Sequence, residues 1–399
     1  MEATLTWLDL TASDRDQMRR VLDLFREQGT VDEMGLGTVR DALSNVLFPG
    51  ITSIQTRLRY VLFIPWIYQR LEERGIPADR ITDEARQGEI ALIEPLANSA
   101  DNEGVFGRFS GASLQRLPSS VYWGLLRRLG MFQHRGSQSW YHSRFASLYR
   151  STGGVERPDD PGVDHQAASN WHPRLVELRP TEFPSEISFA LTRDEADFIQ
   201  SRIMESCSGT LLAWLVSRSR DTPAQNFWED SDALAAGDKV AKTVELARRF
   251  SLHVEGMPLL YNLLLAERLA KFVKEPKEEV SVDTYRAFWS EWAGREASEN
   301  VYDLKPLLSV VGGLAPRQRE FIEGWTARLA VVGVREAVDD PQLRRLIVAR
   351  EHTLKKARAR IANTKRLLVW QGNSGTGRMD FNWFRVRRML IDLRQGFAS

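Results

Sequence analysis

GASLQRLPSSVYWGLLRRLGMFQHRGSQSWYHSRFASLY, residues 111–149, is the stretch on which the predicted fold of this chain rests. It predicts a short helix at 112–116 and, after a turn, a second helix that Ser119 caps at its N-terminus. The segments 131–134 and 139–142 predict two strands that pair across a hairpin turn. Helix, turn, helix and β-hairpin in this order are typical of a winged helix-turn-helix module.

The charges of the chain are segregated along the sequence, although they nearly cancel in total. The net charge is +1, from 54 Lys and Arg against 53 Asp and Glu. Residues 104–155 contain seven Arg and no acid, and residues 341–399 contain fourteen Lys and Arg against three acids, so the rest of the chain carries −17. Compositional drift explains the preference for Arg over Lys but not the missing acids. Blocks of one sign indicate separate basic surfaces with separate partners.

The two basic blocks predict contacts with nucleic acid. The second helix of a winged module can enter the DNA major groove, where Arg127 and Arg128 would reach phosphate or guanine, while Arg135 at the wing tip would touch the backbone. Winged helices also dock proteins, which is the alternative for this block. The predicted nucleic-acid-binding residues are Arg116, Arg127, Arg128, Arg135 and Arg144 in the first block, and Arg344, Lys355, Lys356, Arg358, Arg378, Arg385 and Arg388 in the second.

The chain as a whole predicts a mainly α, multi-domain protein, because one undivided core is unusual at 399 residues. We expect a helical N-terminal domain over 1–150 that ends in the winged module, and a proline-rich connection over 151–191. A helical middle domain over 192–312 and a basic helical domain over 313–399 would follow. Apolar residues recur at helical spacing outside the connection, which has no clear period.

Several helix boundaries have local signals. Thr192 predicts the N-cap of the first helix in the middle domain, and Pro65 predicts a kink in an earlier helix. A long helical stretch is expected to break near Gly256-Met257-Pro258, and Pro341 is expected to open a helix of the basic domain. Asp380 predicts the cap of the final helix. The residues of that helix expected to face inward are Trp383, Val386, Leu390 and Leu393.

Residues able to carry catalysis do not form a recognisable motif. The glycine-rich loop 372–378 lacks the Gly-Lys-Ser/Thr of a nucleotide cradle, so it predicts a flexible turn. His165 and His172 make a poor metal site, and His253 has no obvious acid or nucleophile beside it. A single cysteine, Cys207, excludes a disulfide within the chain. We therefore expect no catalysis, no metal and no cofactor.

The sequence shows no feature that would place the protein in a membrane. No uncharged apolar run reaches the roughly 18 residues that span a bilayer, and the start of the chain lacks a secretory signal. The longest such run, Val61–Tyr68, has eight residues and contains a proline. We expect a cytoplasmic location and no membrane partner.

Short motifs carry a resemblance that covers nearly the whole chain. They include TWLD at 6–9, LFPG at 47–50, PWIY at 65–68, RLPSSVYW at 116–123 and SGTGRMD at 374–380. On these residues the chain resembles an uncharacterised bacterial family, a domain of unknown function of about 400 residues. The resemblance implies no catalytic residue, because no activity is established for that family. Its genes tend to lie beside helicases and nucleases in phage-defence loci, which implies by association a role in antiviral defence.

These observations favour a non-catalytic DNA-binding component of a bacterial antiviral defence system, which presents nucleic acid to a helicase or nuclease partner. DNA is favoured over RNA. One alternative is an adaptor or scaffold whose basic surfaces dock on acidic proteins. A second alternative is a metal-dependent nuclease with dispersed ligands.

Overall fold

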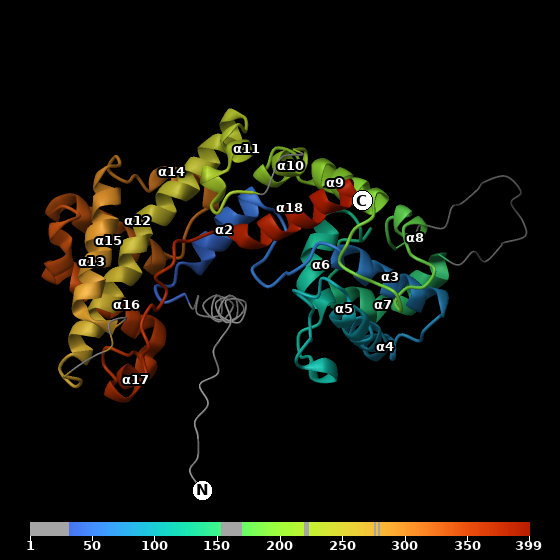
Figure 1. Cartoon of the computed structure of the whole chain (residues 1–399), viewed down its shortest axis with the longest axis horizontal. Coiled ribbons are helices and arrows are strands. Elements are labelled where there is room, and N and C mark those ends of the chain that lie inside the picture. Colours follow the sequence, from blue (N-terminus) through green and yellow to red (C-terminus); the bar gives the residue numbers. More distant parts are fainter. Residues whose placement is uncertain (1–31, 153–169, 219–222, 275–276, 278–279) are drawn as a thin grey trace, which may run out of the picture. The chain divides into compact units, whose positions relative to one another are not determined.

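A computed structural model describes residues 32–152, 170–218, 223–274, 277 and 280–399. Within these ranges the chain is mainly α, as expected, and its one β-type pairing is an isolated antiparallel bridge between Phe132 and Trp171. Two compact units divide the chain (Figure 1). Of the described residues, unit 1 contains those within 32–40 and 246–379, and unit 2 contains those within 41–245 and 380–399. Each unit therefore combines stretches that are far apart in the sequence.

The helices follow one another through short connections. Two of the three divisions between the units fall inside α2 (Gly37–Leu47) and α12 (Asp238–Leu269), and the third lies between Met379 and Asp380. Unit 2 also contains α3 (Tyr60–Glu73), α4 (Ile81–Ile90), α5 (Ile93–Asn98), η1 (Gly111–Ser113), α6 (Pro118–Arg128), α7 (Gln138–Thr152), α8 (Arg174–Glu177), α9 (Arg193–Ser206), α10 (Leu211–Val216), η2 (Phe227–Glu229), α11 (Ser231–Leu234) and α18 (Trp383–Ala398). Unit 1 also contains α13 (Val282–Ala297), α14 (Lys305–Val311), α15 (Pro316–Val332), η4 (Glu336–Asp339), α16 (Pro341–Lys355), η5 (Lys356–Arg358) and α17 (Thr364–Leu368).

The centre of unit 2 is α3, which is buried on every side from Tyr60 to Gln69. It packs on α4, α6 and α8. The helix continues through Pro65, where the sequence predicted a kink. A proline in a helix interior costs about 3 kcal/mol, because it removes one backbone hydrogen bond. Burial of the apolar side chains around Pro65 offsets that cost.

The last helix, α18, packs mainly against α9, and Figure 1 shows the two side by side. Its predicted inward residues, Trp383, Val386, Leu390 and Leu393, are all buried. The contact is close at Gly396, where a β-carbon would lie 2.8 Å from the Cβ of Leu191 and 2.9 Å from the Cβ of Ala196. Only glycine fits this approach. The predicted N-cap at Thr192 is also confirmed, as part of a capping box with Glu195.

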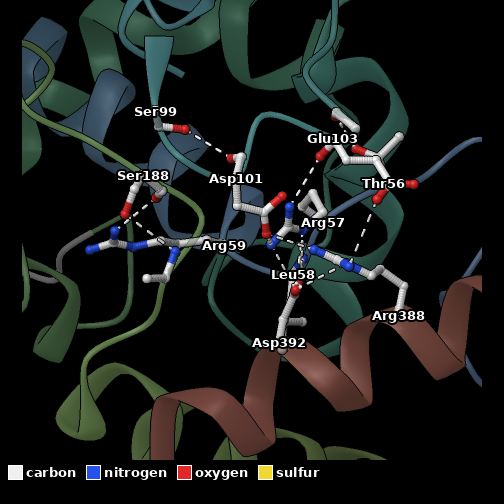
Figure 2. Close-up of polar contacts among 12 residues, drawn as sticks. Thr56, Arg57, Leu58, Arg59, Ser99, Asp101, Glu103, Ser188, Arg388 and Asp392 are labelled. Atoms are coloured by element: carbon white, nitrogen blue, oxygen red, sulfur yellow. Dashed lines mark hydrogen bonds and ion pairs between the residues drawn. The ribbon is translucent and has the colours of Figure 1, made fainter. Parts of the chain in front are cut away.

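A buried ion pair links α18 to the segment just ahead of α3, at Arg57 and Leu58 (Figure 2). The Nη2 of Arg57 lies 2.9 Å from Asp392 Oδ1, and its Nε donates to both oxygens of the same carboxylate. The backbone N–H of Leu58 donates to Asp392 Oδ2 at 3.0 Å. On its other side, Arg57 pairs with Asp101 at 2.7 Å and donates to the carbonyl of Glu103. Arg57 and Asp392 are each only 2% exposed.

The segment expected to form a wing is helical in its second half. Residues 139–142 lie inside α7, and Phe132 bridges to Trp171 rather than to this segment. The burial pattern gives the physical reason. In a strand, Ser143 would face the same side as Tyr141 and Phe145, but Ser143 is exposed while the two aromatic residues are fully buried. The described order in this segment is therefore helix, turn, helix, without the predicted β-hairpin.

Unit 1 is organised around tryptophans on α13 and α15. Trp292 is fully buried and donates to the carbonyl of Leu252, and Trp325 donates to that of His253. The ring of Trp292 sits against Gly256, where a β-carbon would lie 2.4 Å from it. The sequence predicted a helix break near Gly256 and Pro258, but α12 continues through both. Glycine serves here to admit a large ring, and burial on all sides holds the helix together.

Among the described residues, no helix combines the length and hydropathy needed to cross a bilayer.

We predict that Asp392→Ala lowers the free energy of unfolding of unit 2 by about 3–5 kcal/mol, because it leaves the Arg57 guanidinium buried without its main counter-ion. Chemical denaturation of the full chain, followed by circular dichroism, measures this change. Asp79→Ala is the matched control, since Asp79 is exposed and makes no ion pair within the described residues; its effect should stay within about 0.5 kcal/mol. Equal stability of the two variants would contradict the structural role of the pair.

Candidate nucleic-acid interface

The outer face of α6 carries two of the predicted arginines. One face of α6 is buried, through Val121, Tyr122, Leu125 and Leu126. The helical period therefore exposes the opposite face to solvent. Arg127 and Arg128 are both exposed, as are Gly124 one turn earlier and Ser120 two turns earlier. A β-carbon at Gly124 would meet nothing within 4 Å. The exposed face of α6 is therefore smooth along its length and positively charged at its C-terminal end.

The turn between α6 and α7 holds Arg135 at the surface. Trp123 donates from Nε1 to the carbonyl of Gly136 at 3.2 Å, which anchors the turn from below. The ring of Trp140 covers Gly136 so closely that a β-carbon there would lie 2.0 Å from it. The turn thus requires glycine at 136. Arg135, next to it, is exposed.

Two further arginines of the acid-free block are exposed nearby in the chain. Arg116 precedes α6, and Arg144 lies on α7 with its guanidinium 5.1 Å from the ring centre of Trp140. In the described part of the chain, none of the five predicted arginines of this block forms an ion pair with an acid. These residues, Arg116, Arg127, Arg128, Arg135 and Arg144, are called the arginine face below.

An exposed aromatic residue that the sequence reasoning missed lies in the same block. Phe109 is 98% exposed, and the guanidinium of Arg108 lies 5.8 Å from its ring centre. The loop that presents it is hydrogen-bonded: Gly107 and Gly111 have φ values of +79° and +51°, and the carbonyl of Gly107 accepts from the N–H groups of Ser110 and Gly111. The sequence signal for this exposed loop was a phenylalanine that follows Arg108 and lies between Gly107 and Gly111.

A buried chain of hydrogen bonds fixes the helices beneath the arginine face. Ser119 donates from its backbone N–H and its hydroxyl to Glu89 on α4, rather than capping α6 as predicted. Gln138 on α7 donates from Nε2 to the Ser119 hydroxyl and to the hydroxyl of Tyr68 on α3. The Tyr68 hydroxyl also lies within hydrogen-bond distance of Nε2 of His142, 2.8 Å away. Four helices are thereby joined by one directional network.

Burial sets the protonation of this network. It raises the pKa of Glu89 to about 7, although the hydrogen bonds from Ser119 oppose the shift. It also lowers the pKa of His142, which favours the neutral ring. The arginine face therefore rests on a layer whose charge changes near neutral pH.

The second predicted basic surface is largely paired with acids. Arg344 binds Glu267 at 2.7 Å and Asp339 at 3.2 Å. Lys355 is hydrogen-bonded to Glu33. Charge that is neutralised inside the unit is not available to a polyanion.

Some of the remaining predicted residues of this block lie in unit 1 and the others lie in unit 2. The Nε of Arg378 lies 3.7 Å from Glu255, Arg385 donates to a backbone carbonyl, and Arg388 pairs with Asp101 at 2.7 Å (Figure 2). Only Lys356 and Arg358 are exposed and, among the described residues, without an acidic partner. The predicted set divides into Arg344, Lys355, Lys356, Arg358 and Arg378 in unit 1, and Arg385 and Arg388 in unit 2.

His253 has the acid partner that the sequence did not reveal. Its Nδ1 lies 2.7 Å from Glu296, its Nε2 lies 2.9 Å from the Thr326 hydroxyl, and its ring stacks on Tyr302. The histidine is only 2% exposed, so this arrangement joins α12, α13 and α15 in the core. Its pKa is lowered by burial, despite the hydrogen bond to Glu296.

The other polar candidates of the sequence have structural partners or lie outside the described residues. The glycine-rich loop is anchored at Ser374, whose backbone N–H and carbonyl both bond the Asn262 side chain. His172 packs against Phe198, and His165 lies outside the described residues. The described part of the chain contains no group of three or more His, Cys, Asp or Glu side chains arranged to hold a metal ion.

The described residues form a helical protein in which the five exposed arginines of the arginine face pair with no acid. A family model matches residues 2–396, and the chain belongs to this family of unknown function, DUF6361. No curated protein and no solved structure matches the chain.

We predict that unit 2 becomes less stable as the pH rises, because Glu89 then ionises at a buried position. The pKa of the buried Glu89 carboxyl is higher in the folded state than the usual 4.5. Its contribution to stability is therefore complete below pH 4.5 and is lost as the pH rises to about 7. The loss is at most about 3 kcal/mol. The measurement is the difference in unfolding free energy between the protein and its Glu89→Gln variant from pH 4.5 to 7.5.

The matched control is Glu94→Gln, at an exposed position on α5. Its difference from the unaltered protein should stay flat across this pH range. A flat difference for Glu89→Gln as well would show that the carboxyl is ionised throughout.

Proposed function

We propose that this protein binds DNA through the arginine face of unit 2. The observation that carries the proposal is the contrast between the two basic blocks. Most of the predicted cations of the second block bond acids or backbone carbonyls of their own unit, whereas the arginines of the first are exposed and bond no acid within the described chain. Exposed guanidinium groups without counter-ions can replace the cations condensed on a nucleic acid, and the release of those cations drives binding.

Stabilisation of the helix end is a weaker explanation. Cations in the last turn of a helix interact favourably with its carbonyl end, which accounts for about 0.3–1 kcal/mol each at Arg127 and Arg128. It does not account for Arg135 in the turn, for Arg144 within α7, or for Arg116 ahead of α6. Contact with phosphates explains all five positions.

The proposed binding mode uses helices rather than a wing. Ahead of the two arginines, the exposed residues of α6 are the small Ser120 and Gly124. A nucleic-acid backbone can therefore approach the helix closely. Phe109, next to Arg108 in the loop ahead of α6, supplies an exposed aromatic surface on which an unpaired base can stack. The favoured substrate is therefore partly opened DNA, with duplex on the arginines and an unpaired base on Phe109.

The proposed biological role is a non-catalytic component of bacterial antiviral defence that presents DNA to a helicase or nuclease. It rests on the gene neighbourhood associated with the resembling family, and on no residue of the site. An adaptor that docks the same arginines on an acidic protein is the second candidate, because the fully exposed Phe109 suits a protein pocket as well.

We predict that Arg127→Glu with Arg128→Glu weakens binding to DNA of every sequence by at least tenfold. Five neutralised phosphates give a log–log salt slope of roughly −4.5 on duplex, and the double variant should make it shallower by about 2. Fluorescence anisotropy with labelled duplexes between low and moderate salt measures both. Arg317→Glu with Arg335→Glu, two exposed arginines of unit 1, applies the same charge change as a control.

Equal loss in both double variants, or affinity independent of salt, would refute the arginine face as the binding surface. Co-purification with a protein after nuclease treatment, with no binding of DNA, would favour the adaptor.

We predict that Phe109→Ala weakens binding to forked or single-stranded DNA by about 5- to 100-fold, because stacking on one aromatic ring contributes about 1–3 kcal/mol per base. Binding to blunt duplex should not change. Phe272→Ala is the control, since Phe272 is a half-exposed phenylalanine of unit 1. Equal weakening on blunt and forked DNA would argue against stacking.

A further inference from the structure

Unit 1 has a shallow hollow at the C-terminal end of α16, with a volume of about 590 Å³. Its wall is formed by the last turn of α16, by η5 and by the start of α17. Three of the residues that line it can carry positive charge, namely His352, Lys356 and Lys365, and Thr364 adds a hydroxyl. The volume is in the range of small-molecule sites, roughly 300–1,000 Å³.

The cations of the hollow lack acidic partners because the neighbouring acids face inward. Glu351 is buried and accepts hydrogen bonds from Tyr261 and from the backbone N–H groups of Arg360 and Ile361. Glu33 forms ion pairs with Lys355 and Arg360.

In contrast, His352, Lys356 and Lys365 are exposed, and within the described residues they form no ion pair. The Thr364 hydroxyl has no hydrogen-bond partner there either. Positive charge and a free donor therefore converge on one hollow.

The backbone of Lys356 supports a role for this residue. Its φ and ψ are +50° and −124°, a conformation that glycine adopts readily and that costs other residues about 1–3 kcal/mol. The strain is held by hydrogen bonds from the N–H of Lys356 to the carbonyl of His352 and from Ala359 to the carbonyl of Lys356. Glycine would suit this turn better, so the lysine side chain supplies something other than stability.

We infer that this hollow binds a phosphomonoester, either the phosphate of a free nucleotide or the 5′-phosphate at a nucleic-acid end. Two lysines and a histidine line one hollow, which suits a compact anion rather than an extended backbone. Thr364 adds a hydroxyl donor. The site lies in unit 1, so it does not depend on the arginine face of unit 2.

The test uses the full chain with Arg127→Glu and Arg128→Glu, which removes the proposed contribution of the arginine face. Calorimetric titrations compare inorganic phosphate, adenosine monophosphate, and one oligonucleotide with a 5′-phosphate or a 5′-hydroxyl. We expect the 5′-phosphate to tighten oligonucleotide binding at least threefold if the ligand is a nucleic-acid end. Binding of phosphate and the mononucleotide, without this preference, would identify a free nucleotide as the ligand.

Lys356→Gly and Lys365→Ala should each reduce phosphate binding at least fivefold. Lys356→Gly should leave the unfolding transition unchanged or raise it, which separates lost binding from misfolding. Arg345→Ala removes an exposed charge from α16 outside the hollow and should have no effect. The inference is overturned if phosphate binds no better than chloride, or if all three variants lose binding equally.

Discussion

The structure of unit 2 depends on the buried ion pair between Arg57 and Asp392. It joins the start of the central helix α3 to α18, which the chain reaches more than 300 residues later. The pair also recruits Asp101 and, through it, Arg388. Because the pair is desolvated, removing either side chain leaves the other as an uncompensated buried charge, which destabilises the fold. Arg388, which the sequence assigns to a nucleic-acid-binding surface, is thereby part of the ion-pair network that closes the fold.

This use of charge explains why net charge along the sequence is an incomplete guide to surfaces. The block 341–399 carries an excess of cations, but Arg344 and Lys355 find acids elsewhere in the chain. Acids from outside the block neutralise these two cations in space. The block 104–155 remains unneutralised at its exposed described arginines, because its helices α6 and α7 direct them outward.

The sequence predicted much of the helical structure, because local signals determine helix ends and faces. The cap at Thr192, the start of α16 at Pro341 and the buried face of α18 all follow from such signals. The β-hairpin was wrong because 139–142 suits a strand locally, and only burial of Tyr141 and Phe145 fixes the helical period. Partners such as Glu296 for His253, and the exposure of Phe109, depend on contacts between distant segments.

The central claim is that DNA lies on the arginine face. The most direct measurement is photo-crosslinking of the full chain to forked DNA that carries a photoreactive base beside the junction, with mass spectrometry of the linked peptides. The account predicts cross-links within residues 107–148, at Phe109 and along α6 and α7. Cross-links confined to peptides of unit 1, or none at DNA concentrations that saturate binding, would contradict it.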